Sequence, residues 1–160
     1  MNQDWQSIFV QDAALFPHLA DLQKDQLLLS TMSEAAFRQA SFLDQRILTP
    51  ELQRQIVSWT DVASISLPTL PKPHYIFHIG HVGSTLISRL LGELDTVLAL
   101  REPAILRQLA EVRINQPADL GWTDEEQAKR LGEVESWLSR TFRADQRVII
   151  KASSFVSPLA

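Results

Sequence analysis

The stretch from residue 74 to residue 91 limits the possible folds of this chain most, because a strand pattern, a glycine turn and a helix pattern follow one another without interruption. Four of residues 75–79 are β-branched or aromatic without clean alternation, which is typical of a strand covered on both faces; they are Tyr75, Ile76, Phe77 and Ile79. Residues 84–91 repeat apolar side chains at helical spacing. The expected buried side of this helix consists of Leu86, Ile87, Leu90 and Leu91.

The turn between this strand and helix has the composition of an anion-binding loop. Gly80 and Gly83 can adopt positive φ, which lets backbone N–H groups turn inward, and the hydroxyls of Ser84 and Thr85 suit a helix start. A helix N-terminus also carries about half a positive charge, which favours phosphate or sulfate. We therefore expect an anion to bind the loop formed by Gly80, His81, Val82, Gly83, Ser84 and Thr85.

Two further segments are predicted strands that end in polar side chains. Residues 96–100 lead into Arg101 and Glu102, and residues 147–150 lead into Lys151. Helices are predicted between them, and alternating strands and helices favour a parallel sheet with right-handed crossovers. Ligands of such sheets bind beyond the carboxyl ends of the strands. The sequence therefore predicts a ligand site where the three strands end.

The first 70 residues predict a helical segment made of short, capped pieces. A capping box at residues 31–34 and a start signal at Thr49-Pro50-Glu51 each precede apolar side chains at helical spacing. Residues 67–73 contain three prolines, which favours an extended linker. We therefore expect a helical segment over residues 1–70 and an α/β domain over residues 71–160. The expected helical stripes are Leu15, Leu19 and Leu22, then Phe37, Ala40, Leu43 and Ile47, then Leu52, Ile56 and Trp59.

Composition narrows the classes of partner. The 160 residues carry a formal net charge of -4 with mixed signs, so no basic face for nucleic acid is expected. Cysteine is absent, which excludes disulfides, thiolate zinc sites and cysteine nucleophiles. The first residues are polar and acidic, and no apolar run approaches about 18 residues. We expect a cytosolic (cytoplasmic) location and no membrane partner.

Residues 74–156 resemble the P-loop sulfotransferases, and bacterial members in particular. The similarity consists of Phe77-His78-Ile79, Gly83-Ser84-Thr85-Leu86, Leu100-Arg101-Glu102-Pro103 and Ile150-Lys151. The resemblance implies a three-layer αβα P-loop domain with a parallel sheet. It also implies sulfuryl transfer from 3′-phosphoadenosine 5′-phosphosulfate to a hydroxyl or amine of a small-molecule acceptor, without a metal. This chain departs from the family at His81, where a Lys or Arg is usual.

The resemblance assigns roles to the polar residues at the strand ends. The loop of residues 80–85 and Arg101 would bind the co-substrate, although Arg101 could instead pair with Glu102. His81, Lys151 and Glu102 are the candidate catalytic residues. Lys151 would replace the missing loop cation if the third strand neighbours the first, and Glu102 would act as general base. A histidine carries charge only when protonated, and its unperturbed pKa is about 6.5, so His81 is a poorer cation at neutral pH.

Other functions remain open from the sequence. A kinase-like nucleotide-binding protein is one alternative, although the Walker motif is incomplete because Ser84 stands at its lysine position. A non-catalytic binding module with a degenerate loop is another. The histidines at 74, 78 and 81 have the spacing of metal ligands on a helix, but the surrounding strand pattern disfavours zinc. A serine hydrolase is disfavoured because Gly-x-Ser-x-Gly is absent.

The resemblance also predicts that the α/β domain is incomplete. In the family, a later strand carries the site of the 3′-phosphate and pairs with the outer edge of the P-loop strand. This sequence ends at Ala160, shortly after its third predicted strand. We therefore expect a C-terminally truncated chain whose activity in this form is open. The unpaired apolar edge predicts self-association.

Overall fold

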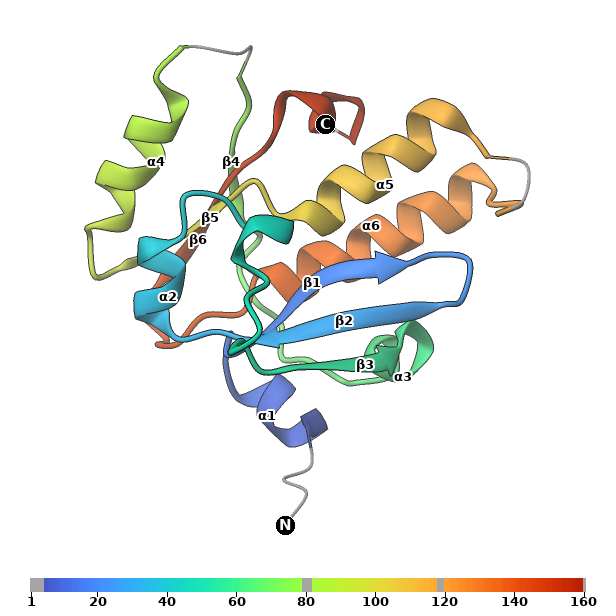
Figure 1. The fold of residues 1–160 in the computed structure, drawn as a ribbon, viewed down its shortest axis with the longest axis horizontal. Coiled ribbons are helices and arrows are strands. Elements are labelled where there is room, and N and C mark those ends of the chain that lie inside the picture. Colours follow the sequence, from blue (N-terminus) through green and yellow to red (C-terminus); the bar gives the residue numbers. More distant parts are fainter. Residues whose placement is uncertain (1–4, 79–81, 118–119, 160) are drawn as a thin grey trace.

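A computed structural model describes residues 5–78, 82–117 and 120–159 (Figure 1). It has two three-stranded sheets, one antiparallel and one parallel, with helices between and around them. The strands are β1 (Leu15–Asp21), β2 (Gln26–Thr31), β3 (Arg54–Ser58), β4 (His74–Ile76), β5 (Val97–Arg101) and β6 (Arg147–Lys151). The α-helices are α1 (Trp5–Gln11), α2 (Glu34–Gln39), α3 (Trp59–Ala63), α4 (Ser84–Gly92), α5 (Ala104–Asn115) and α6 (Asp124–Leu138), with 3-10 turns at Gln45–Ile47 and Ser154–Leu159.

The predicted parallel sheet is confirmed. Its strand order is β4-β6-β5, so β6 is central and β4 lies at an edge. The adjacency of the first and third predicted strands, which the resemblance implied, is therefore present. Helix α4 lies on one side of this sheet, and α5 and α6 lie on the other (Figure 1). The protein is thus a mixed α/β fold.

The two long helices follow their sequence signals. Thr123 is the N-cap of α6, and its hydroxyl accepts a hydrogen bond from the N–H of Glu126, which is the pattern typical of a Thr-x-x-Glu sequence at a helix start. The apolar side of α5 is buried at Ile105, Leu106, Leu109 and Ala110. Local signals and burial agree in this part of the chain, which is why its elements could be placed from the sequence.

Helix α4 forms where predicted, but the prediction of its buried side is wrong. Leu86, Ile87 and Leu90 are 62%, 49% and 62% exposed. The side that faces the sheet carries Ser84, Ser88 and Gly92. A Cβ atom at Gly92 would lie 3.1 Å from the Cβ of Ala99, so only small residues allow the helix to approach β5 this closely.

The prediction that residues 1–70 are helical is also wrong for most of the segment. Leucines 15, 19 and 22 lie on or beside β1, which pairs antiparallel with β2. The turn between them contains Asp25 at φ +53, a left-handed conformation that aspartate tolerates. Pro17 has no backbone N–H to donate to β2, and the register between β1 and β2 shifts between Pro17 and Leu19. Hydrogen bonding between strands therefore outweighs the helical spacing of the leucines.

The third predicted helix of this segment is likewise replaced by β3, which pairs antiparallel with β2. The β-branched pair Ile56-Val57 favours a strand, and Ser58 caps the short helix α3 that follows. Only the second predicted helix is present, and it is shortened to α2 and the turn at Gln45–Ile47. Ser33 is its N-cap, two residues after Thr31, where the predicted capping box begins.

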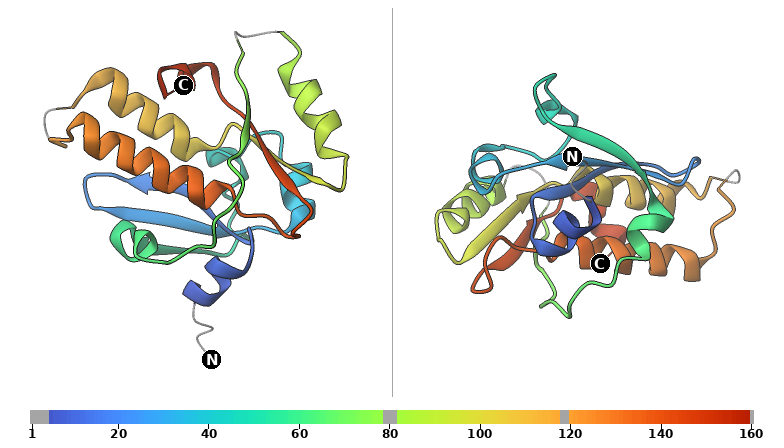
Figure 2. Two further views of the ribbon diagram at one scale, coloured as in Figure 1. Left: turned by 180° about the vertical axis from the view of Figure 1, so that it is seen from behind. Right: turned by 90° about the horizontal axis from the view of Figure 1, so that it is seen from below.

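The segments before and after the proline-rich linker share one hydrophobic core. Phe9 and Leu27 from the first segment lie in the same buried cluster as Leu109 and Trp137 from the second. Arg140, just after α6, donates hydrogen bonds to the backbone carbonyls of Phe9, Asp12 and Leu15. The views in Figure 2 show the antiparallel sheet packed along α5 and α6.

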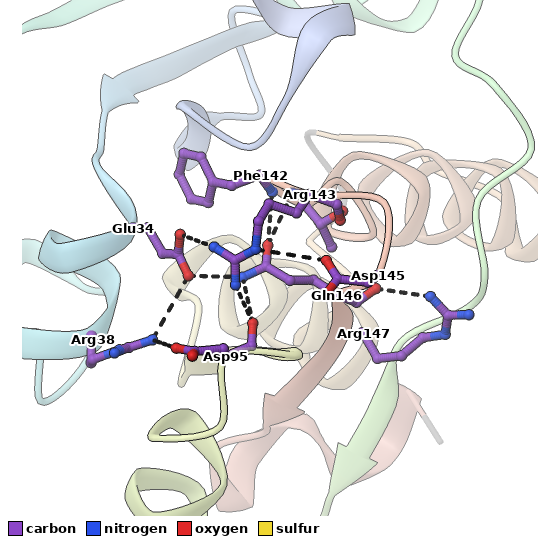
Figure 3. A network of polar contacts seen from close by, with 9 residues as sticks. Glu34, Arg38, Asp95, Phe142, Arg143, Asp145, Gln146 and Arg147 are labelled. Atoms are coloured by element: carbon purple, nitrogen blue, oxygen red, sulfur yellow. Dashed lines mark hydrogen bonds and ion pairs between the residues drawn. The ribbon is translucent and has the colours of Figure 1, made fainter.

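A polar network holds α2 against the amino ends of β5 and β6 (Figure 3). The buried Gln146 side chain donates to Glu34 over 2.8 Å and accepts from the backbone N–H groups of Phe142 and Arg143. Arg143 also pairs with Glu34 and donates to the carbonyl of Asp95. These contacts fix the sheet at the edge opposite its carboxyl ends.

We expect acid to destabilise the fold through His18. This histidine is fully buried, its Nε2 lies 3.0 Å from the carbonyl oxygen of Asp44, and its Nδ1 lies 2.9 Å from the Ser30 hydroxyl. Burial lowers the pKa of His18, so the folded state favours the neutral ring. The stability that the neutral ring of His18 contributes is fully present above the unfolded pKa of about 6.5, and it is lost as the pH falls below that value.

Urea unfolding at several pH values checks this prediction with His18→Gln as the matched variant. The wild-type free energy of unfolding should fall by up to about 1.4 kcal/mol per pH unit more steeply than that of the variant between about pH 6.5 and pH 5. Equal slopes in the two proteins would show that His18 does not produce the acid sensitivity.

Candidate functional site

The carboxyl ends of the three parallel strands lie side by side. In the register of the sheet, Lys151 is opposite Ile76 of β4 on one side and opposite Arg101 of β5 on the other. The chain continues the pairing for one more step, because the N–H of Glu102 donates to the carbonyl of Lys151 over 2.7 Å. This arrangement brings together the strand ends that the sequence predicted to be polar.

Three titratable side chains meet at this edge. The Lys151 ammonium forms an ion pair with the Glu102 carboxylate, and Nε2 of His78 lies 3.9 Å from the same Glu102 oxygen. The side chains of Lys151, His78 and Glu102 are 2%, 10% and 23% exposed, respectively. Phe42 covers Lys151 with its ring 5.6 Å from Nζ. Glu102 is therefore the most accessible member of a largely buried cluster.

Neither ring nitrogen of His78 has a hydrogen-bond partner among the residues that the structure describes. Burying a polar group without a partner costs free energy, and such groups in native proteins call for an explanation. A bound ligand would supply one. His78 was not among the residues that the sequence analysis assigned to the site, although its position two residues before the loop was a usable signal.

Glu102 has a left-handed backbone conformation, with φ at +51. This conformation is uncommon for a residue with a side chain, and residues held in it occur disproportionately at functional sites. Pro103 follows as the N-cap of α5, so the chain turns sharply from strand to helix at this point. The turn directs the carboxylate toward Lys151 instead of into solvent.

The side chain of Arg101, at the end of β5, contacts the backbone at the end of α2. Its guanidinium donates to the backbone carbonyls of Phe37, Arg38 and Ala40 at the end of α2. The residue is buried, and desolvation together with nearby Arg89 lowers its pKa. With these donors engaged, Arg101 joins α2 to the sheet, and among the described residues it forms no ion pair with Glu102.

The predicted loop is described in part. Gly83 is the N-cap of α4 with φ at +80, the conformation for which a glycine was expected, and no side chain caps this end of the helix. Ser84 is buried, Thr85 is half-buried and Val82 is exposed. Gly80 and His81 lie outside the described residues. Because its N-cap is a glycine, α4 receives no hydrogen bond from an N-cap side chain.

The described residues contain neither a cluster of metal-ligating side chains nor a helix that could span a membrane. In residues 5–78, 82–117 and 120–159, no three His, Asp or Glu side chains are grouped as a metal site. Across the same ranges, no helix combines the length and apolar character required to cross a bilayer.

The chain was also compared with known proteins. Neither family models, nor curated proteins, nor solved structures give a match.

Proposed function

We propose that this chain is a sulfotransferase-like P-loop protein. It would transfer a sulfuryl group from 3′-phosphoadenosine 5′-phosphosulfate to a hydroxyl or amine of a small-molecule acceptor. The observation that carries the proposal is the meeting of His78, Glu102 and Lys151 at the carboxyl ends of the parallel strands. Helix α4, whose glycine N-cap makes no side-chain hydrogen bond, begins beyond the same edge of the sheet (Figure 1).

The chemistry assigns a task to each group. As the acceptor oxygen bonds to sulfur, the bond from sulfur to the bridging oxygen breaks, so negative charge grows on the departing 5′-phosphate. Backbone N–H groups of residues 80–85 and the dipole of α4 would stabilise that charge. Lys151 would add a permanent cation, and His81 would add one only when protonated. Glu102 would accept the proton of the acceptor.

The ion pair between Lys151 and Glu102 bears on how the site would work. In the free protein the Lys151 ammonium is bound to one Glu102 oxygen, so Lys151 must leave Glu102 to bind a phosphate. A phosphosulfate that attracts Lys151 would free the Glu102 carboxylate to accept a proton. Donor binding would then activate Glu102 as the base. Glu102 would therefore not take a proton from the acceptor before the donor is bound.

Calorimetric titration with adenosine 3′,5′-bisphosphate, the product nucleotide, tests the proposal. Wild-type protein should bind it more tightly than ATP with Mg²⁺. Gly83→Asp should weaken binding at least about tenfold, because a carboxylate and backbone strain are introduced where the phosphate would lie. Gly121→Asp is the matched control, since Gly121 also has positive φ and open space around its Cβ direction.

The outcomes separate the alternatives. A preference for ATP with Mg²⁺ would favour a kinase-like protein instead. Nucleotide binding without turnover for any acceptor would favour a non-catalytic binding module. If neither nucleotide binds, the sulfotransferase proposal fails.

We also propose that copies of the chain associate through the open edge of β4. In the described part of the protein, β4 pairs with β6 on one side only, and the apolar side of α4 is a second uncovered surface. Phe77, which follows β4, is exposed and stacks on Tyr75. A charge at Phe77 should disfavour pairing at this edge.

Sedimentation velocity at increasing concentration checks the association. We expect the wild-type protein to form dimers, and Phe77→Lys should shift them toward monomer. Ile114→Gln, which replaces an exposed apolar residue on α5, should not. Loss of the dimer in Leu86→Gln/Leu90→Gln but not in Phe77→Lys would place the contact on α4 and overturn the edge proposal. A wild-type monomer at all concentrations would overturn association altogether.

A further inference from the structure

A cavity of about 430 Å³ lies beside Glu102, between the turn at Gln45–Ile47, the first turns of α5 and the chain after β6. Its lining includes Asp44, Gln45, Glu102, Arg107, Glu111 and Ser153. Small-molecule sites usually have volumes of about 300–1,000 Å³, so this cavity is at the small end of that range. A hollow of about 480 Å³ between β1 and α5 is slightly larger, but none of the residues that line it lies at the carboxyl end of a parallel strand.

The charges in and around the cavity are balanced. Each of its three carboxylates already pairs with one cation, so the formal charges of these groups sum to zero. An anion would still meet three carboxylates, and a cation would have to compete with an existing partner at each one. The site therefore favours a neutral ligand. The pairs are Asp44 with Arg46, Glu102 with Lys151, and Glu111 with Arg107.

The lining also selects for a ligand with many hydroxyl groups. Paired carboxylates retain free lone pairs and accept hydrogen bonds from hydroxyls, while the Gln45 amide and Ser153 hydroxyl can both donate and accept. The lining is mostly polar, with Ala104 as its apolar member. A phenol, steroid or lipid would displace water from these polar groups without replacing the hydrogen bonds that the groups had made to that water.

We propose that this cavity binds the acceptor and that the acceptor is a compact neutral polyol, such as a monosaccharide unit. The inference rests on the proposed sulfotransferase function and adds the substrate class. Glu102 lines the cavity and also contacts Lys151 and His78, so a hydroxyl in the cavity would lie beside the reacting groups. That hydroxyl oxygen bonds to sulfur, its proton passes to Glu102, and the bond from sulfur to the 5′-phosphate oxygen breaks.

Backbone amide NMR during titration with D-glucose tests the proposal. The amide signals of Gln45, Ala104, Glu111 and Ser153 should shift and saturate. Cyclohexanol, which has the same ring size and one hydroxyl, and the anion D-gluconate should produce no saturable shift at these positions. Glu111→Gln should raise the dissociation constant for glucose about tenfold, because a charge-assisted hydrogen bond is weakened. Glu125→Gln, an exposed glutamate on α6, is the matched control.

Three results would overturn the inference: no saturable shift with glucose, equal or stronger shifts with cyclohexanol, or glucose-induced shifts that Glu111→Gln leaves unchanged. The same samples are then titrated with adenosine 3′,5′-bisphosphate. Nucleotide binding without glucose binding removes the polyol inference alone. Glucose binding without nucleotide binding removes the transferase proposal and with it the acceptor role, while the polyol site remains.

Discussion

Replacing Arg101 by methionine should reduce the free energy of unfolding by about 3–5 kcal/mol, the largest loss of stability that we expect from one substitution. The guanidinium is 1% exposed and donates to three carbonyls at the end of α2, with distances between 2.5 and 2.8 Å. Methionine has similar length but no donors, so these carbonyls would lose their partner in a poorly solvated place. Urea unfolding followed by circular dichroism measures the loss.

Two further variants show whether the effect comes from this hydrogen-bond geometry. Arg101→Lys keeps the charge but cannot reproduce the planar fork, so it should recover only part of the stability. Arg54→Met removes an exposed arginine from β3 and should leave the unfolding curve unchanged. A folded Arg101→Met protein with wild-type stability and lost nucleotide binding would contradict our structural role for Arg101 and restore its role in phosphate binding.

Breaking the pair between Lys151 and Glu102 should produce the second largest effect. Glu102→Gln leaves a charged lysine whose side chain is 2% exposed, and removing one partner of a buried pair costs about 3–5 kcal/mol. Lys151→Met should cost less, because the remaining Glu102 is 23% exposed and can reach water. The double variant should be more stable than the sum of the single losses predicts, with a coupling energy of about 1–3 kcal/mol.

The same variants separate stability from binding. Lys151→Met should weaken binding of adenosine 3′,5′-bisphosphate because the cation is removed, whereas folded Glu102→Gln should retain it. A parallel cycle on the exposed pair of Lys24 and Asp21 should show no measurable coupling. Additive losses at Lys151 and Glu102 would mean that the observed ion pair contributes nothing specific to the site.

The α/β half of the fold could be predicted because its signals are local. Thr123 and Glu126 mark a helix start, and each apolar run of a parallel strand stops at a polar residue. The side of α4 that packs on the sheet could not be predicted from the same logic. Its sequence has one side of large apolar residues and another of small ones, and periodicity does not say which side the sheet contacts.

The first half of the chain was predicted less well because its structure depends on distant partners. Leu15, Leu19 and Leu22 fit a helix by spacing, but hydrogen bonds from β1 to β2 stabilise a strand instead. Arg101 was correctly placed at a strand end, yet its partners come from α2, about 60 residues earlier in the chain. The sequence placed Glu102 and Lys151 at neighbouring strand ends, where they form an ion pair, but it did not assign His78, which lies beside Glu102, to the same group.

Backbone amide NMR of the loop before α4, recorded during titration with adenosine 3′,5′-bisphosphate, tests the central claim most directly. If the start of α4 binds the phosphate, the amide protons of Gly83, Ser84 and Thr85 should shift downfield and saturate together with the signal of Glu102. Saturable shifts confined to other parts of the chain, with these three amides unchanged, would contradict the account.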